Sequence, residues 1–515
     1  MSASKPLPSE LYSVASVIAL ERIAIDLFHV CDYTLMKRAG AAVFDVMRDR
    51  YAQCRHILVV CGAGNNAGDG YVVARLAKQA GLDVTVVSLI DTTRLGGPAK
   101  QACQDWCEVG VITAADHDVL TDADIVVDAM LGTGLKRDLD DQWAGWIAAI
   151  NHASKPVVAV DVPSGLYADT GCTSNAGAVM AEVTISFIGL KQGLFTAQAG
   201  DFCGEILLDT LGLGDEILSQ VEADALLLQQ QTLTRLAARR ASSNKGSFGH
   251  VLIVGGNRGM PGAIVLAARA ALRTGAGKVT VVTHPENLQT VVNAVPEAMI
   301  KTCGDQAEAG EVFDDVFIAG VTHIAVGPGL GTDDWSVMLL KHCIAAGKPL
   351  LVDADGLNLI AAHHGEAGYR IETPLIITPH PGEAGRLLEC QHGRVDIQHN
   401  RFESVRLLQR MFHTDTGVAP RIVILKGYGS LIDDGEKIRV CHAGNAAMAS
   451  AGMGDVLSGI TAALWAQADA LALDAVEVAE IGVCLHACTA DRVTGGGTRG
   501  LLASDITDHL HELLP

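Results

Sequence analysis

Two tracts of the chain repeat the same order of apolar and polar positions. Each opens on a short apolar run, continues through a glycine-rich loop and ends in apolar residues at helical spacing; the tracts are 56–81 and 249–277. A short apolar run bounded by glycines is typical of a buried strand, and the spacing that follows is typical of a helix. Both tracts therefore predict a strand, a turn and a helix, in that order.

More strand-like runs follow each of these openings. The first half contains VTVVSLI, DIVVDAM, PVVAVDVPSG and VTISFIG, and the second contains KVTVVTH, HIAVGPGLG, PLLVDADGLN, LIITPHPGEAG and RIVILKGYGSLI. Strands that alternate with helices form mainly parallel sheets covered by helices. The pattern predicts an α/β protein with two such sheets.

A change in composition marks the boundary between the two halves. With 515 residues the chain is too long for one domain of ordinary size. Within 215–245 the acidic, Leu- and Gln-rich DEILSQVEADALLLQQQ gives way to the basic, small-residue RLAARRASSNKGSFG. We predict a boundary at about residue 225, giving domains at 1–225 and 226–515.

Composition and charge exclude several classes of protein. Hydrophobic residues make up 49% of the chain, which is enough for real cores and excludes a wholly disordered protein. Asp and Glu number 59 against 38 Lys and Arg, a net charge of −21. Because an acidic protein repels phosphate backbones and anionic lipids, we expect neither a nucleic-acid partner nor a membrane partner.

The same data predict a cytoplasmic location. No run of about 18 apolar residues occurs, and the start MSASKPLPSELYSVASVIALERI has no small-residue cleavage pattern after its apolar part. The 13 cysteines are scattered without CxxC pairs, as in proteins with reduced thiols. We also expect a homo-oligomer, because symmetric homo-oligomers are common among α/β enzymes.

The first glycine loop, GAGNNAGDG at 62–70, stands at a strand-to-helix turn, where α/β proteins bind anions on free N–H groups. Its glycine spacing is one residue longer than the dinucleotide fingerprint, and Asp91 stands about where a ribose-binding acid would. A Rossmann-type dehydrogenase is therefore an alternative. Asp69 counts against it, because a carboxylate inside the loop would repel a pyrophosphate.

Further polar residues of the first half end strands, and the carboxyl ends of parallel strands converge on one crevice. Four of them are expected to meet there: Asn66, Asp128, Asp161 and Ser164. Amide, carboxylate and carbonyl oxygens suit an alkali or alkaline-earth cation. The nearby GTGLKRD adds loop N–H groups, Lys136 and Arg137, which suit an anionic ligand. The alternative is that these acids only cap strand ends and form turns.

The motifs GNNAGDG, DAMLGTG and DVPSG, in this order within roughly 10–220, resemble the NAD(P)H-hydrate epimerase (YjeF N-terminal) family. The resemblance implies a Rossmann-like three-layer domain that binds hydrated NAD(P)H and K⁺. It implies K⁺ near Asn66, Asp128 and Ser164. The implied substrate contacts are Asn65, Asn66, Ala67, Gly68, Asp69, Gly132, Thr133, Gly134, Leu135, Lys136, Arg137, Asp138 and Asp161.

The chemistry of that substrate agrees with these residue types. The hydrate carries its hydroxyl on a carbon bonded to the ring nitrogen, so inversion requires loss and return of oxygen, or opening and closing of the ring. Either route needs a positioned proton donor and acceptor rather than a redox cofactor. We assign the acid/base role to Asp161, with Asp69 as the alternative.

The most distinctive segment of the second half is NAAMASAGMGDVLSG at 445–459. Its glycines let backbone N–H groups surround an anion at the start of an apolar helix. Asp455 would then lie beside a transferring phosphoryl group, placed to take the proton from an attacking hydroxyl. The alternative is that Asp455 is only the N-cap of that helix.

Other loops of the second half also follow apolar runs. The segment 426–430 suits a nucleotide phosphate, and the glycines of 327–331 permit close approach of a ligand to the backbone. His380 lies between two prolines that hold it stiffly, so it is either a substrate contact or a surface turn residue. Asp353 and Asp355 could face the same site or bind Mg²⁺ through water.

The ordered set NRGMPGA, GPGLG, DADGLN, TPHPGE, KGYGS and AGMGD, within roughly 230–512, resembles the ribokinase-like ADP-dependent NAD(P)H-hydrate dehydratase family. The resemblance implies a ribokinase-like α/β domain, ADP as phosphoryl donor, Mg²⁺, and the S epimer of the hydrate as substrate. The implied nucleotide contacts are Lys426, Gly427, Tyr428, Gly429, Ser430 and Gly454. The implied hydrate contacts are Ala263, Gly329, His380 and Asp455, of which Asp455 is also catalytic.

Taken together, the two halves resemble bifunctional NAD(P)H-hydrate repair enzymes. Hydration yields both epimers, and a chiral pocket can phosphorylate only one of them well, so an attached epimerase would supply it with the other. The expected products are NAD(P)H, AMP and phosphate. The alternative is a small-molecule kinase of the vitamin-precursor type fused to a nucleotide-binding domain.

Overall fold

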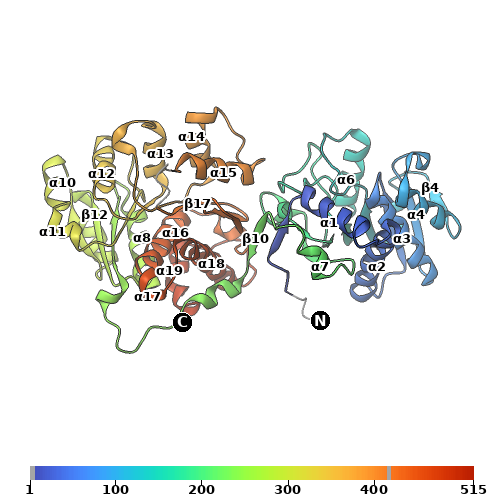
Figure 1. The fold of residues 1–515 in the computed structure, drawn as a ribbon, viewed down its shortest axis with the longest axis horizontal. Coiled ribbons are helices and arrows are strands. Elements are labelled where there is room, and N and C mark those ends of the chain that lie inside the picture. Colours follow the sequence, from blue (N-terminus) through green and yellow to red (C-terminus); the bar gives the residue numbers. More distant parts are fainter. Residues whose placement is uncertain (1–5, 414–418) are drawn as a thin grey trace. The chain divides into compact units, whose positions relative to one another are not determined.

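The computed structural model describes residues 6–413 and 419–515, and the chain divides into two compact units, Met1–Leu226 and Leu227–Pro515. In Figure 1 the first unit is coloured blue to green and the second green to red. The division falls within strand β10 (Ala225–Leu228). Both units carry mainly parallel strands covered by helices, so the predicted α/β class is confirmed.

The first unit is built on a seven-stranded sheet of order β4-β3-β2-β5-β6-β7-β9, in which every neighbouring pair is parallel. Its strands are β2 (His56–Cys61), β3 (Asp83–Ser88), β4 (Ile112–Thr113), β5 (Ile125–Ala129), β6 (Val157–Val160), β7 (Val183–Phe187) and β9 (Glu205–Asp209). The short β1 (Glu10–Tyr12) pairs with β8 (Leu190–Lys191) and with β10.

Helices cover both faces of this sheet, because successive residues of a strand point to opposite sides. Ile57 and Val59 of β2 belong to the core shared with α1, α2, α3 and α4, whereas Leu58 and Val60 belong to the core shared with α5 and α6. The helices are α1 (Val14–Asp26), α2 (Asp32–Arg50), α3 (Asn65–Gln79), α4 (Gly97–Cys107), α5 (Val119–Asp122), α6 (Asp141–Ala153) and α7 (Asp215–Leu218). The sheet and its two helical layers form the predicted three-layer arrangement.

The second unit has its strands in the order β13-β12-β11-β14-β15-β16-β17-β18-β19, parallel from β13 to β17 and antiparallel from β17 to β19. They are β11 (His250–Val254), β12 (Lys278–Thr283), β13 (Met299–Thr302), β14 (His323–Val326), β15 (Leu350–Val352), β16 (Leu375–Ile377), β17 (Arg421–Leu425), β18 (Ser430–Asp433) and β19 (Ile438–Cys441). The antiparallel end places the segment 426–429 in a tight turn between β17 and β18.

Helices also line this second sheet. They are α8 (Pro261–Thr274), α9 (Leu288–Ala294), α10 (Gln306–Val312), α11 (Asp315–Ala319), α12 (Asp334–Ala345), α13 (Ala354–Ala362), α14 (Pro381–His392), α15 (Arg401–Met411), α16 (Met453–Ala466), α17 (Ala468–Leu471), α18 (Ala475–Thr494) and α19 (Ala503–His509). Helices α8, α16 and α18 share one core with the strands.

Small residues let α16 approach α8 closely. A Cβ atom on Gly459 would come within 2.2 Å of the Ala267 carbonyl oxygen and 2.8 Å of the Ala270 Cβ. A larger side chain at Gly459 would therefore push the two helices apart. This contact determines how deeply α16 lies in the unit. The first turn of that helix carries Asp455.

No helix among residues 6–413 and 419–515 combines the length and the apolar character that a membrane crossing requires. All 13 cysteines are free thiols, as expected for a chain with reduced cysteines. The cytoplasmic location and the homo-oligomeric state stay predictions.

Candidate active sites

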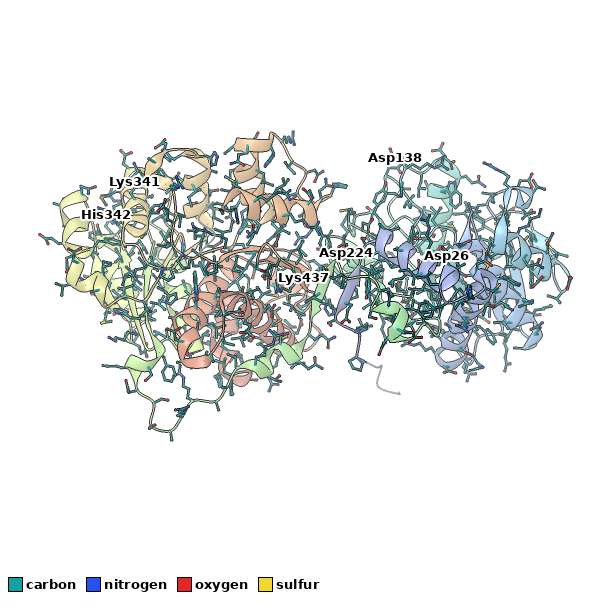
Figure 2. All side chains as sticks on the ribbon, viewed as in Figure 1. Asp26, Asp138, Asp224, Lys341, His342 and Lys437 are labelled. Carbon is teal, nitrogen blue, oxygen red and sulfur yellow. The ribbon has the colours of Figure 1, made fainter. Side chains whose placement is uncertain are left out.

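A cavity of about 840 Å³ opens in the first unit between α1, the start of α3 and the carboxyl ends of β5 and β6. Eleven of the predicted substrate contacts line it: Asn65, Asn66, Asp69, Gly132, Thr133, Gly134, Leu135, Lys136, Arg137, Asp138 and Asp161. Ala67 and Gly68 are buried in α3 and do not line it; a Cβ on Gly68 would meet the Met36 side chain at 2.5 Å. Asp138 lies at an exposed edge of the unit (Figure 2).

Asp161 stands directly after β6 in a left-handed conformation, with φ of 66°. Its backbone N–H donates to the Ile185 carbonyl at 2.8 Å, and its carboxylate accepts the Phe187 N–H at 3.1 Å. A non-glycine residue in this conformation is held there by its surroundings, which is common at functional sites. The strand-end position inferred from the sequence thus places this carboxylate at the cavity wall.

Lys191, on β8, forms an ion pair with Asp161 and is only 1% exposed. Its ammonium group also donates to the Phe187 carbonyl at 2.8 Å and the Ser186 hydroxyl at 3.2 Å. All three of its donors therefore have partners. A buried ammonium needs a compensating charge, so Lys191 and Asp161 act as a unit.

Asp69 lies in α3, is 7% exposed and lines the same cavity. Burial raises its pKa well above the ordinary value, the nearby carboxylates of Asp161 and Glu21 add to this, and Lys191 opposes it. Desolvation and like charges both favour the neutral form of a carboxyl group. Asp69 is thus suited to hold a proton beside the cavity.

Glu21 of α1 also lines the cavity, although no motif of the sequence indicated it. Burial raises its pKa first, and the Asp161 carboxylate adds to this. Val17, Leu20 and Ala24 of the same helix are buried at helical spacing, which was a signal for an amphipathic helix. Nothing local indicated that Glu21 would face strands more than a hundred residues away.

The predicted cation ligands lie together beside this cavity. Asp128 is fully buried, and its carboxylate accepts hydrogen bonds from the Ser164 hydroxyl at 2.5 Å and the Ser164 N–H at 2.7 Å. Burial raises the pKa of Asp128 to about 6, against the hydrogen bonds from Ser164. Within residues 6–413 and 419–515, the buried amide oxygen and nitrogen of Asn66 find no hydrogen-bond partner.

Oxygen donors with unfilled hydrogen-bonding capacity fit a weakly binding cation such as K⁺. A Cβ on Gly132 would lie 3.3 Å from the Asn66 amide oxygen, so this oxygen faces the substrate loop. In the part of the chain that the structure describes, no cluster of three or more His, Cys, Asp or Glu side chains suits a metal ion. The cation set of Asn66, Asp128 and Ser164 is of a different kind, since it mixes amide, carboxylate and hydroxyl.

In the second unit, Asp455 lies in the first turn of α16. The N-cap of this helix is Gly452, at φ 89°, so the alternative that Asp455 is the N-cap is wrong. Burial raises the pKa of Asp455 to about 7, with Asp353 the strongest of the neighbouring carboxylates in the same direction and Lys426 opposing it. Such a carboxyl group exchanges a proton near neutral pH, as a general base must.

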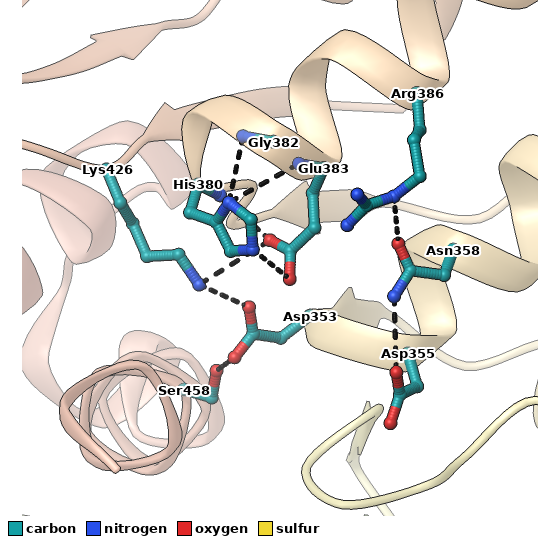
Figure 3. A network of polar contacts seen from close by, with 9 residues as sticks. All are labelled: Asp353, Asp355, Asn358, His380, Gly382, Glu383, Arg386, Lys426 and Ser458. Carbon is teal, nitrogen blue, oxygen red and sulfur yellow. Dashed lines mark hydrogen bonds and ion pairs between the residues drawn. The ribbon is translucent and has the colours of Figure 1, made fainter. Parts of the chain in front are cut away.

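Lys426 lies among the acids of this site (Figure 3). Its ammonium group is 2.7 Å from Asp353 Oδ1 and 3.9 Å from Glu383 Oε2. Burial alone would lower the pKa of Lys426, but the carboxylates of Asp353 and Glu383 raise it. A Cβ on Gly454 would lie 3.1 Å from the Lys426 Nζ, so the predicted nucleotide contacts Gly454 and Lys426 are neighbours.

His380 is the N-cap of α14 and faces the same group (Figure 3). Its Nδ1 accepts the Gly382 N–H at 2.9 Å, and its Nε2 lies 3.2 Å from Glu383 Oε1. Burial lowers the pKa of His380, and the charge of Lys426 adds to this. The imidazole is half exposed, so it both caps the helix and stays open to a ligand.

The other two predicted hydrate contacts meet at the start of α8. Gly329, at φ 57°, is so placed that a Cβ would lie 3.0 Å from the Ala263 Cβ and 2.9 Å from the Met260 carbonyl oxygen. Only glycine fits such a conformation without strain. The loop 327–331 therefore packs directly against the helix that carries Ala263.

Arg401, which no motif of the sequence indicated, binds the inner side of the loop 426–430. The Arg401 side chain is 1% exposed, and its guanidinium donates to the carbonyls of Leu425 and Lys426 at 3.3 Å and of Gly429 at 3.2 Å. A Cβ on Gly427 would lie 2.7 Å from the Arg401 Nη1. Because the Arg401 guanidinium binds the carbonyls of the turn, the N–H groups of the turn can face outward.

Comparisons with known proteins match each unit to a family. Residues 251–512 match the model described as NAD(P)H-hydrate dehydratase, and residues 32–193 match the model described as YjeF-related protein N-terminus. The bifunctional NAD(P)H-hydrate repair enzyme Nnr of Coxiella burnetii is 40% identical over 98% of this chain and 99% of its own length. That of Escherichia coli K12 is 39% identical over 99% of this chain and 94% of its own.

Among solved structures, the ADP/ATP-dependent NAD(P)H-hydrate dehydratase of Bacillus subtilis, co-crystallised with ATP/Mg²⁺, is 27% identical. The match covers 55% of this chain and 96% of that chain, with a TM-score of 0.47.

The acids and lysines at the carboxyl ends of both sheets define an α/β enzyme with two separate sites. The chain matches both family models, one in each unit, and the relatives named as bifunctional repair enzymes are similar to it over nearly their whole length. The chain belongs to the family of bifunctional NAD(P)H-hydrate repair enzymes, which confirms the resemblance described above. The match of residues 32–193 also removes the support for a Rossmann-type dehydrogenase.

Proposed function

We infer that the protein repairs hydrated NADH and NADPH. The first unit interconverts the R and S epimers, and the second dehydrates the S epimer at the expense of ADP, giving NAD(P)H, AMP and phosphate. The observation that carries this inference is Asp455, whose pKa of about 7 and place beside Lys426 suit a general base. It lies in the region that matches the dehydratase family.

In the second unit, Asp455 takes the proton of the substrate hydroxyl while that oxygen attacks the terminal phosphorus of ADP. The bond from this phosphorus to the bridging oxygen breaks, and AMP leaves. The lone pair of the ring nitrogen then expels phosphate from the ester, and loss of a proton from the adjacent carbon restores the dihydropyridine. Lys426 and the N–H groups of 427–430 balance the phosphate charge, and Ala263, Gly329 and His380 hold the hydrate.

Mg²⁺ fits this site as a companion of the nucleotide. Both oxygens of Asp353 have partners, and Glu383 is engaged by His380 and Lys426. Mg²⁺ commonly keeps its waters and binds through substrate phosphates. When bound, it neutralises charge on the phosphates, while the residues of the chain orient the reacting groups.

In the first unit, Asp161 is the proton acceptor and Asp69 the donor. Lys191 forms an ion pair with Asp161, and the burial of Asp69 favours its protonated form. Departure of the hydroxyl as water needs the donor, and return of water to the other face of the ring needs the acceptor. The loop 132–138 and Asn65 would hold the rest of the dinucleotide.

K⁺ would be held by Asn66, Asp128 and Ser164. The unpartnered amide of Asn66 and the fully buried carboxylate of Asp128 support this proposal. When bound, the ion neutralises Asp128, and Asn66 together with Gly132 keeps the substrate loop in place.

Purified full-length protein tests this function. With a mixture of hydrated NADPH epimers and ADP, the absorbance of the dihydropyridine should return completely, and AMP and phosphate should form in equal amounts. Failure to recover it with either ADP or ATP would contradict the proposal. Nothing here favours the vitamin-precursor kinase, which would instead accumulate a phosphorylated product and leave the absorbance unchanged.

A further inference from the structure

Asp353 connects three elements of the second unit through a single carboxylate (Figure 3). Its Oδ1 accepts from the Lys426 ammonium at 2.7 Å, and its Oδ2 accepts from the Ser458 hydroxyl at 2.7 Å. Asp353 follows β15 as the N-cap of α13, where its side chain makes no capping bond. Each of its two oxygens therefore serves a different neighbour.

Lys426 belongs to the proposed reaction machinery, and Ser458 lies on the helix that carries Asp455. Lys426 opens the turn between β17 and β18, and Ser458 lies one helical turn after Asp455 on α16. Asp353 is 1% exposed and Ser458 is fully buried, so no water competes for these bonds. This one carboxylate thus links the first turns of α16 to the turn 426–429.

We propose that Asp353 is a positioning residue for the dehydration reaction: by holding Lys426 and Ser458 at once, it sets the distance and direction between the general base Asp455 and the nucleotide turn. The proposal rests on the proposed function of the second unit. Asp353 does not touch substrate; it acts through the two residues that it binds.

Stability alone does not explain why a charged group is kept at this place. Replacing a buried ion pair by apolar residues is often neutral or stabilising, and the apolar core around α8, α16 and α18 is already extensive. The charged groups that face Asp455 are Asp353, Lys426, Asp355 and Glu383. Asp353 is the strongest carboxylate among them, so it influences the protonation of Asp455 as well as its position.

The decisive variant is Asp353→Asn in the full-length protein, because the amide keeps the shape and removes the charge. We expect kcat of ADP-dependent dehydration at pH 7 to fall about tenfold or more, with a smaller change in KM for ADP. The acid limb of kcat/KM should move at least one unit to lower pH, because Asp455 loses a like charge and Lys426 loses its partner. Epimerisation in the first unit is the internal control and should be unchanged.

Two further variants separate position from charge. Ser458→Ala keeps every charge and removes one bond to Asp353, so kcat should fall about fivefold with no shift of the pH profile, and Ser458→Thr should restore part of the loss. Asp355→Asn removes a charge of the same sign, but Asp355 binds the Gly331 N–H and Asn358 rather than Lys426. Its effect on the pH profile should be smaller than that of Asp353→Asn.

A readout that does not need turnover separates failure of the positioning role from failure of the proposed function. The titration of the Asp455 carboxyl can be followed by carbon NMR, its signal being identified by its absence in Asp455→Asn. A shift to lower pH in Asp353→Asn supports the action of Asp353 on Asp455, whereas a wild type that proves inactive with ADP contradicts the proposed function. An active Asp353→Asn variant with an unmoved profile, or a loss of melting temperature that accounts for all lost activity, overturns the positioning role.

Discussion

Both units contain a lysine, a carboxylate paired with it and a second acid, but the two units arrange these charges differently. In each, a lysine forms an ion pair with a carboxylate that ends a parallel strand, and a second acid with a raised pKa lies nearby. The pairs are Lys191 with Asp161 beside Asp69, and Lys426 with Asp353 beside Asp455.

The difference between the two lysines indicates different proton chemistry. Lys191 uses its donors on Asp161 and on Ser186 and Phe187 at the end of β7. Burial and nearby carboxylates raise the pKa of Asp69, which favours its protonated form. Lys426 lies among several acids and keeps the pKa of Asp455 at about 7. Under the proposed function, the first site therefore offers a proton donor and the second a base that titrates near neutral pH.

The largest expected effect is that of Asp455→Asn. Removal of the base should reduce ADP-dependent dehydration about 10²- to 10⁴-fold, while epimerisation stays at the wild-type rate. The two activities can be measured on the same sample, by recovery of dihydropyridine absorbance and by chromatography of the two epimers. If Asp455→Asn retained dehydration, the second site would not need an acid beside its ion pair, and the two sites would differ in this respect.

In the first unit, Lys191→Met should reduce epimerisation about 10²-fold and destabilise the fold by about 3 kcal/mol, because Asp161 loses its counter-charge. The double variant Lys191→Met/Asp161→Asn removes the whole pair and should regain much of that stability but none of the activity. Thermal unfolding and epimer exchange measure the two quantities. If the double variant regained activity, the ion pair would be structural only.

Sequence patterns located the acids that end strands or begin helices, because these positions are fixed by local structure. Asp161 and Asp455 each follow a short motif whose strand or glycine turn can be identified without the rest of the chain. The order of the motifs then sufficed to place both at the carboxyl ends of parallel sheets.

Residues whose role depends on distant packing could not be found in this way. Arg401 begins an ordinary amphipathic helix, and only the fold brings it beneath a turn 25 residues later. Ser458 resembles any small residue inside an apolar helix, and its bond to Asp353 spans 105 positions. Glu21 lies in a helix outside the matched family region and reaches the cavity only through tertiary packing.

The pH dependence of the two activities tests the contrast in proton chemistry directly. Because Asp455 must be ionised to act as a base, kcat/KM for dehydration should fall about tenfold per unit of pH below about 7 and level off above it. Epimerisation should decline on the alkaline side instead, where Asp69 loses its proton. Profiles of the same shape for both activities would contradict the contrast.

The raised pKa of Asp455 also makes the free energy of unfolding depend on pH. The folded protein binds the Asp455 proton more tightly than the unfolded chain does, whose aspartates titrate at about 4. Between about pH 4 and 7 this group therefore lowers the free energy of unfolding as pH rises. Denaturant unfolding of Asp455→Asn should show a flatter dependence over that range than the wild type does.

The smallest expected effect concerns the cation that we propose for the first unit alone. Replacing K⁺ by Na⁺ should slow epimerisation about fivefold and leave dehydration of the pure S epimer unchanged, because Asn66, Asp128 and Ser164 all belong to the first unit. Asn66→Ala should abolish this salt response at little cost in stability, since its amide has no hydrogen bond to lose within the described residues. If both activities responded equally to the cation, its effect would arise at the nucleotide rather than in the first unit. The proposed difference between the units would then be wrong.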